Sequence, residues 1–293
     1  MFLTALLTLS AACVLTREEV GSWDGVVLIV NFNNMKAFEE QRADMVALHA
    51  LYAPAFAHIV FTGEPAYDAS RLPYRFVVCT GSRNGWHFQT CFADVVARVR
   101  ARTGYLFTND DCIVNHWTLH TLNLRRFWLS PHGTNVEDVS GAACPVRWHW
   151  SNPEVCAGAK RAYAALAPAH RAQLARNMGG EHRIPGAFAD IFYVPSPLVS
   201  PLVDVMTRTG FRRGVIMEIT VPSVMLALVP RDEVEWFTQG GVLWGSDRAA
   251  WKRIYSPALQ FIHPIKFSEP DAAAFIVGTF AIYSASRGNA TES

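Results

Sequence analysis

The residues with the clearest chemical potential follow a short apolar segment near the middle of the chain. Residues 105–108 (Tyr-Leu-Phe-Thr) run directly into Asn109, Asp110 and Asp111. This pattern predicts a strand that ends in polar side chains, and open α/β sheets bind ligands outside the carboxyl ends of their strands. Two adjacent carboxylates repel each other unless a divalent cation, for example one that holds a diphosphate, lies between them. An ordinary turn is the alternative, because Asn and Asp are frequent turn residues.

Two polar residues near the end of the chain extend the metal hypothesis. His263 and Lys266 lie three residues apart. An imidazole can complete the coordination of a metal ion, and an ammonium group can neutralise a phosphate. The alternative is that both side chains lie at the surface of a closing loop.

Glu218 is the single acid within the apolar segment 215–228 (VIMEITVPSVMLAL). A carboxylate in apolar surroundings costs free energy unless it is paired or functional. Burial would raise its pKa, which suits a general base that works near neutral pH. The alternative is a helix that turns Glu218 toward its polar side.

Composition and motifs exclude several function classes. The chain has 293 residues, of which 51% are hydrophobic and 12% aromatic, so it is not mainly disordered. Its net charge of +1 argues against a nucleic-acid binder that works through a broad basic face. The chain has no GxGxxG segment that opens a helix, no Walker A loop, no HExxH and no GxSxG.

Alternating apolar and amphipathic segments must position these residues. Strands are predicted at residues 26–32, 58–62, 75–79, 105–108 and 189–194. Helices are predicted at residues 36–52, 86–102, 153–178 with an interruption near Pro168, 197–206 and 215–228. Strands separated by helices in the first half indicate βαβ units and a parallel sheet. We therefore predict an α/β fold, a single sheet domain flanked by helices over residues 21–270.

The two ends of the chain and its cysteines carry information on the cellular compartment of the protein. Residues 2–15 form an apolar run of fourteen residues, shorter than the roughly 20 that span a bilayer. We interpret residues 1–20 as a signal peptide or hydrophobic leader, and residues 271–293 as a C-terminal tail. The six cysteines form no CxxC, so a zinc cluster is not expected. They are either buried free thiols or include a bridge such as Cys144–Cys156.

Several segments together resemble the STELLO-type (DUF288) glycosyltransferase family. The most specific is Gly104 to Trp117 (GYLFTNDDCIVNHW). The other matching segments, in the order of the family, are residues 26–33 (VVLIVNFN), 51–63, 189–195 (ADIFYVP), 218–222 (EITVP) and 263–268 (HPIKFS). The resemblance therefore extends over nearly the whole chain after the leader.

The resemblance implies a GT-A-like fold in which an acidic motif holds Mn²⁺ or Mg²⁺ against the diphosphate of a nucleotide-sugar. Here the motif begins with Asn109 instead of Asp. The implied metal ligands are Asp111, Asp110 and His263. The implied contacts to the nucleotide or its diphosphate come from Asn31, Phe32, Asn33, Asn109, Asp110, Arg248 and Lys266. Glu218 stands where inverting members of this fold place a catalytic base.

The expected function is a metal-dependent glycosyltransferase that moves a sugar from a nucleotide-diphosphate donor to a hydroxyl group of a glycan or other acceptor. Two alternatives stay open: an inactive scaffold in a glycan-synthesis complex, and a metal-dependent phosphohydrolase. The phosphohydrolase would need a third acidic ligand, which the surrounding spacings do not supply. We expect no nucleic-acid partner, a secretory-pathway or Golgi location, and membrane association through the leader.

Overall fold

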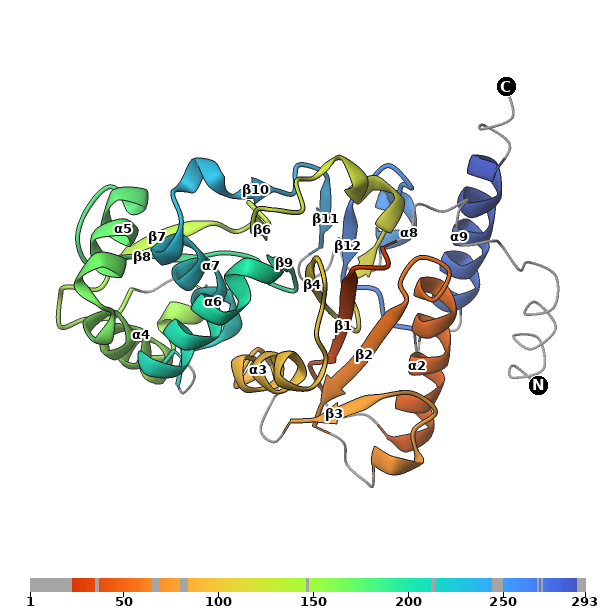
Figure 1. The fold of residues 1–293 in the computed structure, drawn as a ribbon, viewed down its shortest axis with the longest axis horizontal. Helices are drawn as coiled ribbons and strands as arrows, with labels where there is room; N and C mark the ends of the chain where they lie inside the picture. Colours follow the sequence, from red (N-terminus) through yellow and green to blue (C-terminus); the bar gives the residue numbers. More distant parts are fainter. Residues whose placement is uncertain are drawn as a thin grey trace.

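The computed structural model describes residues 23–34, 37–64, 69–79, 84–145, 148–211, 214–243, 250–267, 269 and 271–288. The predicted leader at residues 1–20 and the predicted diphosphate contact Arg248 lie outside these ranges. Within them, we find no helix whose length and apolar character would suit a membrane crossing. Figure 1 shows the arrangement of the elements.

A seven-stranded sheet with the order β10-β6-β9-β4-β1-β2-β3 forms the centre of the fold. Its strands are β1 (Val26–Phe32), β2 (His58–Gly63), β3 (Phe76–Val78), β4 (Gly104–Asn109), β6 (Trp128–Leu129), β9 (Ile191–Pro195) and β10 (Glu235–Trp236). Strands β3, β2, β1 and β4 are parallel to one another, as the first half of the sequence predicts. Strand β9 runs antiparallel to β4 and β6, so the complete sheet is mixed and not purely parallel.

Helices cover both faces of the sheet (Figure 1). Their bounds are α2 (Phe38–Tyr52), α3 (Phe88–Arg98), α4 (Pro153–Ala165), α5 (Pro168–Met178), α6 (Ser196–Arg208), α7 (Met217–Leu228), α8 (Trp251–Ile254) and α9 (Ala272–Gly288). Short 3-10 helices lie at Ala69–Arg71, His116–Thr121, Trp148–Ser151 and Arg231–Glu233. The predicted α/β sheet flanked by helices is confirmed.

Strand β1 shows why the first half of the chain is so apolar. All seven of its residues are buried. Val27 and Ile29 belong to the hydrophobic core that includes α3 and α7, whereas Val26 and Leu28 belong to the core on the opposite face, with α2. A strand covered on both faces needs apolar side chains at successive positions, which is the pattern of this segment.

A second, three-stranded sheet brings a late segment of the chain to the end of β4. It has the order β11 (Gly240–Val242), β12 (Phe261–His263) and β5 (Ile113–Val114). The antiparallel pair β12–β5 places Ile262 opposite Ile113, immediately after Asp111 and Cys112 in the chain. A separate two-stranded ribbon pairs β7 (Asn135–Asp138) with β8 (Arg183–Gly186).

The segment interpreted as a C-terminal tail contains a packed helix. Helix α9 lies beside α2 (Figure 1), and its Ala272, Ile276 and Phe280 are buried in the core with α2. The sequence pattern behind this packing is apolar residues spaced four apart, which share one face of a helix.

The cysteines divide into one bridge and three buried thiols among the described residues. Cys144 and Cys156 form a disulfide that connects the loop before α4 to that helix. Cys79, Cys91 and Cys112 are free and buried. The structure therefore contains both of the arrangements that the sequence left open.

We predict that reduction of the Cys144–Cys156 bridge destabilises the fold without unfolding it. The bridge joins residues 12 positions apart, and closing a loop of this length lowers the entropy of the unfolded chain by an amount worth about 3 kcal/mol. Urea unfolding with and without a reductant measures this difference. The double variant Cys144→Ser/Cys156→Ser is the control and should not respond to the reductant. Equal midpoints for the wild-type chain in both conditions would contradict the prediction.

Candidate metal and donor site

Three segments meet at one edge of the main sheet. Strands β1 and β4 are parallel, so their carboxyl ends lie at the same edge, with Asn31 paired opposite Asn109. Strand β9 is antiparallel to β4, so its beginning lies at this edge, and Thr108 pairs with Ile191. The backbone N–H of Asn109 donates to the carbonyl of Asp190 over 2.9 Å. The register therefore places Asp190 beside the acidic segment that follows β4.

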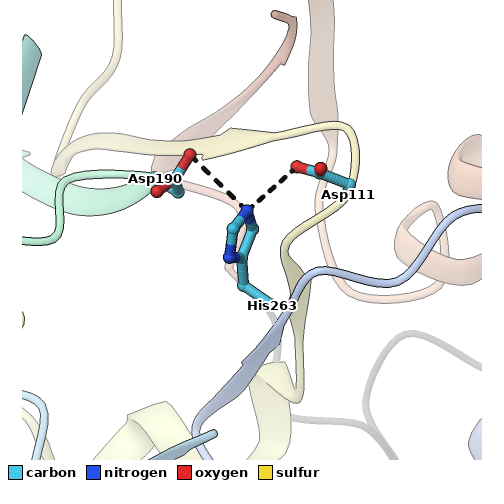
Figure 2. A group of neighbouring side chains, drawn as sticks. All are labelled: Asp111, Asp190 and His263. Carbon is cyan, nitrogen blue, oxygen red and sulfur yellow. Dashed lines mark ion pairs between the residues drawn. The ribbon is translucent and has the colours of Figure 1, made fainter. Parts of the chain in front are cut away.

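His263, the last residue of β12, completes a group of three side chains of the types that can ligate a metal ion (Figure 2). Its Nε2 lies 3.5 Å from Oδ1 of Asp111 and 3.9 Å from Oδ1 of Asp190. One ligand atom from each of the three residues lies within 4.8 Å of the others, and all three residues are buried. The backbone fixes this approach, because the N–H of Ile265 donates to the carbonyl of Asp111 over 2.8 Å.

Charge couples the three residues. Burial would raise the pKa of Asp111, but the hydrogen bond and charge of His263, together with the charge of Lys266, outweigh burial and hold that pKa well below its usual range. Burial raises the pKa of Asp190, and the charge of Asp111 raises it further. Burial would lower the pKa of His263, but the charges of Asp190 and Asp111 raise it. Two carboxyl groups thus share a small space with one imidazole, and each affects the pKa of the others.

Lys266 lies directly beside this group. Its ammonium forms an ion pair with Oδ2 of Asp111, on the carboxylate that also faces His263. The side chain of Lys266 is 36% exposed, whereas that of Asp111 is 11% exposed. The ammonium is therefore placed between a buried carboxylate and solvent, where an anionic ligand could reach it.

The side chains fit a divalent cation. Two carboxylate oxygens and one imidazole nitrogen converge from three elements. Carboxylates suit Mg²⁺ and Mn²⁺, and an imidazole ligand is common for transition metals, so this mixed set fits Mn²⁺ well. A cation would also offset the repulsion between Asp111 and Asp190, which the protein otherwise balances with His263 and Lys266.

Asp190 is the member of this candidate site that sequence reasoning missed. It stands directly before the apolar strand β9 within the segment 189–195, where the sequence predicts only a strand. A lone acid before a strand carries little signal, because the direction of the strand decides at which edge of the sheet the acid lies. Among the described residues the group then holds two carboxylates and one imidazole, so the third acidic ligand of the phosphohydrolase alternative is still not supplied.

The other predicted nucleotide contacts occupy different environments. Asp110 is not part of the group of three, and its Oδ1 accepts a 3.4 Å hydrogen bond from the backbone N–H of Asn33. Asn33 in turn accepts at Oδ1 from the N–H of Gly85 over 2.7 Å. The side chain of Phe32 does not reach the site: it is 1% exposed and packs against aromatic rings of the core that include Phe61. Alternation along β1 turns Phe32 away from the polar side chain of Asn31.

Asn31 and Asn109 are fully buried and contact each other. Nδ2 of Asn31 donates to Oδ1 of Asn109 over 2.9 Å, and Nδ2 of Asn109 donates to Oδ1 of Asp190. Both residues are 0% exposed. The sequence predicts that they bind the nucleotide, whereas the structure shows their carboxamides joined in a row that ends at Asp190.

Glu218 lies in the first turn of helix α7 and is 8% exposed. A Cβ atom on Gly85 would lie 2.8 Å from its Oε2, so the carboxylate packs directly against the backbone of residue 85. Burial raises the pKa of Glu218 to about 8, and the charge of Asp190 contributes to this increase. The predicted base is therefore a buried, protonatable carboxyl close enough to Asp190 to interact with its charge.

Comparisons with known proteins give no family assignment. No protein-family model matches the chain, and no curated protein matches it. Solved structures that are similar include core-mannan synthase A from Aspergillus fumigatus in an Mn/GDP form, at 10% identity and a TM-score of 0.35 over 73% of this chain and 72% of that one. Another is the galactosyltransferase LgtC in complex with donor and acceptor sugar analogues, at 9% identity and a TM-score of 0.38 over 89% and 96%. Likeness at this level assigns neither a family nor a function.

We predict that Glu218→Gln stabilises the metal-free protein at high pH. The pKa of Glu218 is about 8 in the folded chain, against an ordinary value of 4.5. Between these two pH values the unfolded chain releases this proton while the folded chain keeps it, so the carboxyl lowers the free energy of unfolding as pH rises. At about 1.4 kcal/mol per pKa unit, the cost above pH 8 is up to about 5 kcal/mol.

Urea unfolding in EDTA at several pH values tests this prediction. Glu218→Gln and wild type should agree near pH 4.5, and the variant should be more stable at pH 9. Glu233→Gln, at an exposed position, is the matched control. A stability difference that does not change with pH would show that Glu218 is not held protonated.

Proposed function

We propose that this chain is a metal-dependent glycosyltransferase of GT-A-like fold, related to the STELLO-type (DUF288) family. It would transfer a sugar from a nucleotide-diphosphate donor to a hydroxyl group of a glycan or other acceptor. One observation carries the proposal: Asp111, Asp190 and His263 converge at the carboxyl edge of the sheet, with the ammonium of Lys266 on the same carboxylate. This set of side chains suits a cation and the diphosphate that the cation would hold.

Each residue of the site has a role in this proposal. Asp111, Asp190 and His263 would hold Mn²⁺ or Mg²⁺, and Lys266 would turn its ammonium toward the phosphate oxygens. When bound, the cation would stabilise negative charge on the departing nucleoside diphosphate. Burial of the three ligands strengthens these interactions, because the surroundings screen charge less than water does. Arg248 would contribute a second positive charge to the diphosphate.

Glu218 would act on the acceptor. In an inverting transfer, the acceptor oxygen bonds to the anomeric carbon as the bond from that carbon to the diphosphate oxygen breaks, and the hydroxyl proton passes to the carboxylate of Glu218. A pKa of about 8 makes the protonated and ionised forms both accessible near neutral pH. In a retaining transfer, Glu218 would instead orient the acceptor by a hydrogen bond.

The alternatives differ in what they require of the site. An inactive scaffold has no need for two buried carboxylates, an imidazole and an ammonium at one place, so their convergence favours an enzyme. A phosphohydrolase would find two carboxylates and one imidazole among the described residues instead of three acidic ligands. It would cleave a phosphate ester with water and would need no acceptor sugar, and this difference separates it from a transferase.

The proposed location is the secretory pathway or the Golgi. The disulfide between Cys144 and Cys156 supports this, because such bridges persist in oxidising compartments. The apolar leader at residues 1–20 would direct the chain there and could associate it with a membrane. The nucleotide-sugar donor and the acceptor are the expected small-molecule partners, and no nucleic acid is expected.

We predict that the purified chain binds UDP or GDP only when Mn²⁺ is present. Isothermal titration with each nucleotide, with and without Mn²⁺, measures this. Asp111→Ala should abolish binding, because the ion would lose a ligand, whereas Asp232→Ala removes an exposed carboxylate outside the site and should have no effect. Failure of a folded chain to bind either nucleotide would favour the scaffold. Phosphate release without a sugar acceptor would favour the phosphohydrolase.

We predict that Lys266→Met has opposite effects on the two ligands. The ammonium competes with the cation for Asp111, so its removal should tighten Mn²⁺ binding several-fold in the absence of nucleotide. The same change removes a charged hydrogen bond to the diphosphate, worth about 1.5 to 3 kcal/mol, and should weaken nucleotide binding at saturating Mn²⁺ by about 10- to 100-fold. Lys252→Met, at the surface ion pair with Asp271, is the control. Weaker binding of both Mn²⁺ and nucleotide would show that Lys266 does not compete with Mn²⁺ for Asp111.

A further inference from the structure

We propose that Asn109 and Asn31 are positioning residues, whose linked carboxamides orient the carboxylate of Asp190 for a cation. Asn109 then contacts neither the nucleotide nor the metal, although it occupies the first position of the acidic motif. This inference rests on the proposed function, because it concerns the metal-binding group of that function.

Strand register makes the row of side chains. Asn31 pairs with Asn109 across β1 and β4, and Asn109 lies beside Asp190 at the start of β9. Their side chains point to one side of the sheet and are joined in order, from Nδ2 of Asn31 to Oδ1 of Asn109 and from Nδ2 of Asn109 to Oδ1 of Asp190. Both asparagines are fully buried, so the contacts are shielded from water.

The central position requires a group that accepts and donates at once. A carboxamide does both: Oδ1 of Asn109 accepts from Asn31, and its Nδ2 donates to Asp190. An ionised Asp at this position could only accept, and it would place a third negative charge beside Asp190 and Asp111. The Asn that departs from the expected acidic motif is therefore the residue that this neighbourhood needs.

The row is costly to the fold, which argues against a purely structural role. Oδ1 of Asn31 is buried and has no hydrogen-bond partner among the described residues. A buried acceptor without a partner costs about 1 to 3 kcal/mol. An apolar side chain at position 31 would fit a strand whose other residues are Val, Leu, Ile and Phe. The presence of Asn31 despite this cost is explained by its Nδ2, which donates to Asn109 and holds that side chain in place.

The carboxylate of Asp190 depends on Asn109 for its orientation more than that of Asp111 does. Lys266 and His263 both pair with Asp111. Asp190 has His263 at the longer distance of 3.9 Å and the carboxamide of Asn109 in direct contact. Without Asn109, its carboxylate would lose the hydrogen bond that fixes the orientation of Oδ1. Partners behind a ligand typically change metal affinity by about 10- to 100-fold.

The experiment measures Mn²⁺ and nucleotide affinity separately, by isothermal titration of the full chain. Asn109→Leu should weaken Mn²⁺ binding by about 10- to 100-fold and leave nucleotide binding at saturating Mn²⁺ close to wild type. Asn31→Leu should weaken Mn²⁺ binding by a smaller factor, because it acts through Asn109. The matched control is Asn115→Leu, an equally buried asparagine that contacts Ser256, Leu259 and Tyr255 instead. It should leave Mn²⁺ affinity unchanged.

Each contrary outcome has a distinct meaning. If Asn109→Leu binds Mn²⁺ like wild type but loses nucleotide affinity, Asn109 is a nucleotide ligand and the inference fails while the proposed function stands. If wild type itself does not bind Mn²⁺, both fail. If Asn109→Leu does not fold, Asn31→Leu decides. Unchanged Mn²⁺ affinity in Asn31→Leu overturns the inference. A loss of Mn²⁺ affinity without a loss of nucleotide affinity at saturating Mn²⁺ supports it.

Discussion

The site depends on holding two buried carboxylates, Asp111 and Asp190, close to each other. Their mutual repulsion is stronger in the interior than in water, and each also loses hydration. The protein compensates with three kinds of group: the imidazole of His263 between them, the ammonium of Lys266 on Asp111, and the carboxamide of Asn109 on Asp190. Each carboxylate therefore has polar partners without a ligand, and carboxylate and imidazole groups are also the types of side chain that ligate divalent cations.

Strand pairing in the two sheets brings Asp190 and His263 to the residues that follow β4. Antiparallel β9 places Asp190 at the edge where parallel β4 ends, and the pair β12–β5 brings His263 back to the residues after β4. Each pairing fixes register by backbone hydrogen bonds, so His263 is held within a strand and Asp111 and Asp190 are held directly beside strand ends. A slip of one residue in β9 would turn every side chain of that strand to the opposite face.

The predictable part of the fold is the part with the strongest local pattern. Runs such as residues 26–32 are apolar at successive positions because both faces of β1 are covered, and this is visible in the sequence. Asp111 was identifiable by residue type and by its position after an apolar segment, and His263 by residue type and its spacing to Lys266. Asp190 was not, because its place depends on the direction of β9, which the chain between residues 109 and 190 determines. Local sequence also does not predict that the carboxamide of Asn109 donates a hydrogen bond to Asp190.

Several unfavourable features of this fold lie at one edge of the sheet. Oδ1 of Asn31 is buried without a hydrogen-bond partner in the described part of the chain. Burial raises the pKa of Glu218 to about 8 and also raises the pKa of Asp190. The strands that lead to these residues are by contrast almost wholly apolar. Selection for stability alone would have replaced such groups with apolar side chains. Their presence together, next to side chains of the types that ligate metal ions, is the pattern expected where stability is exchanged for chemistry.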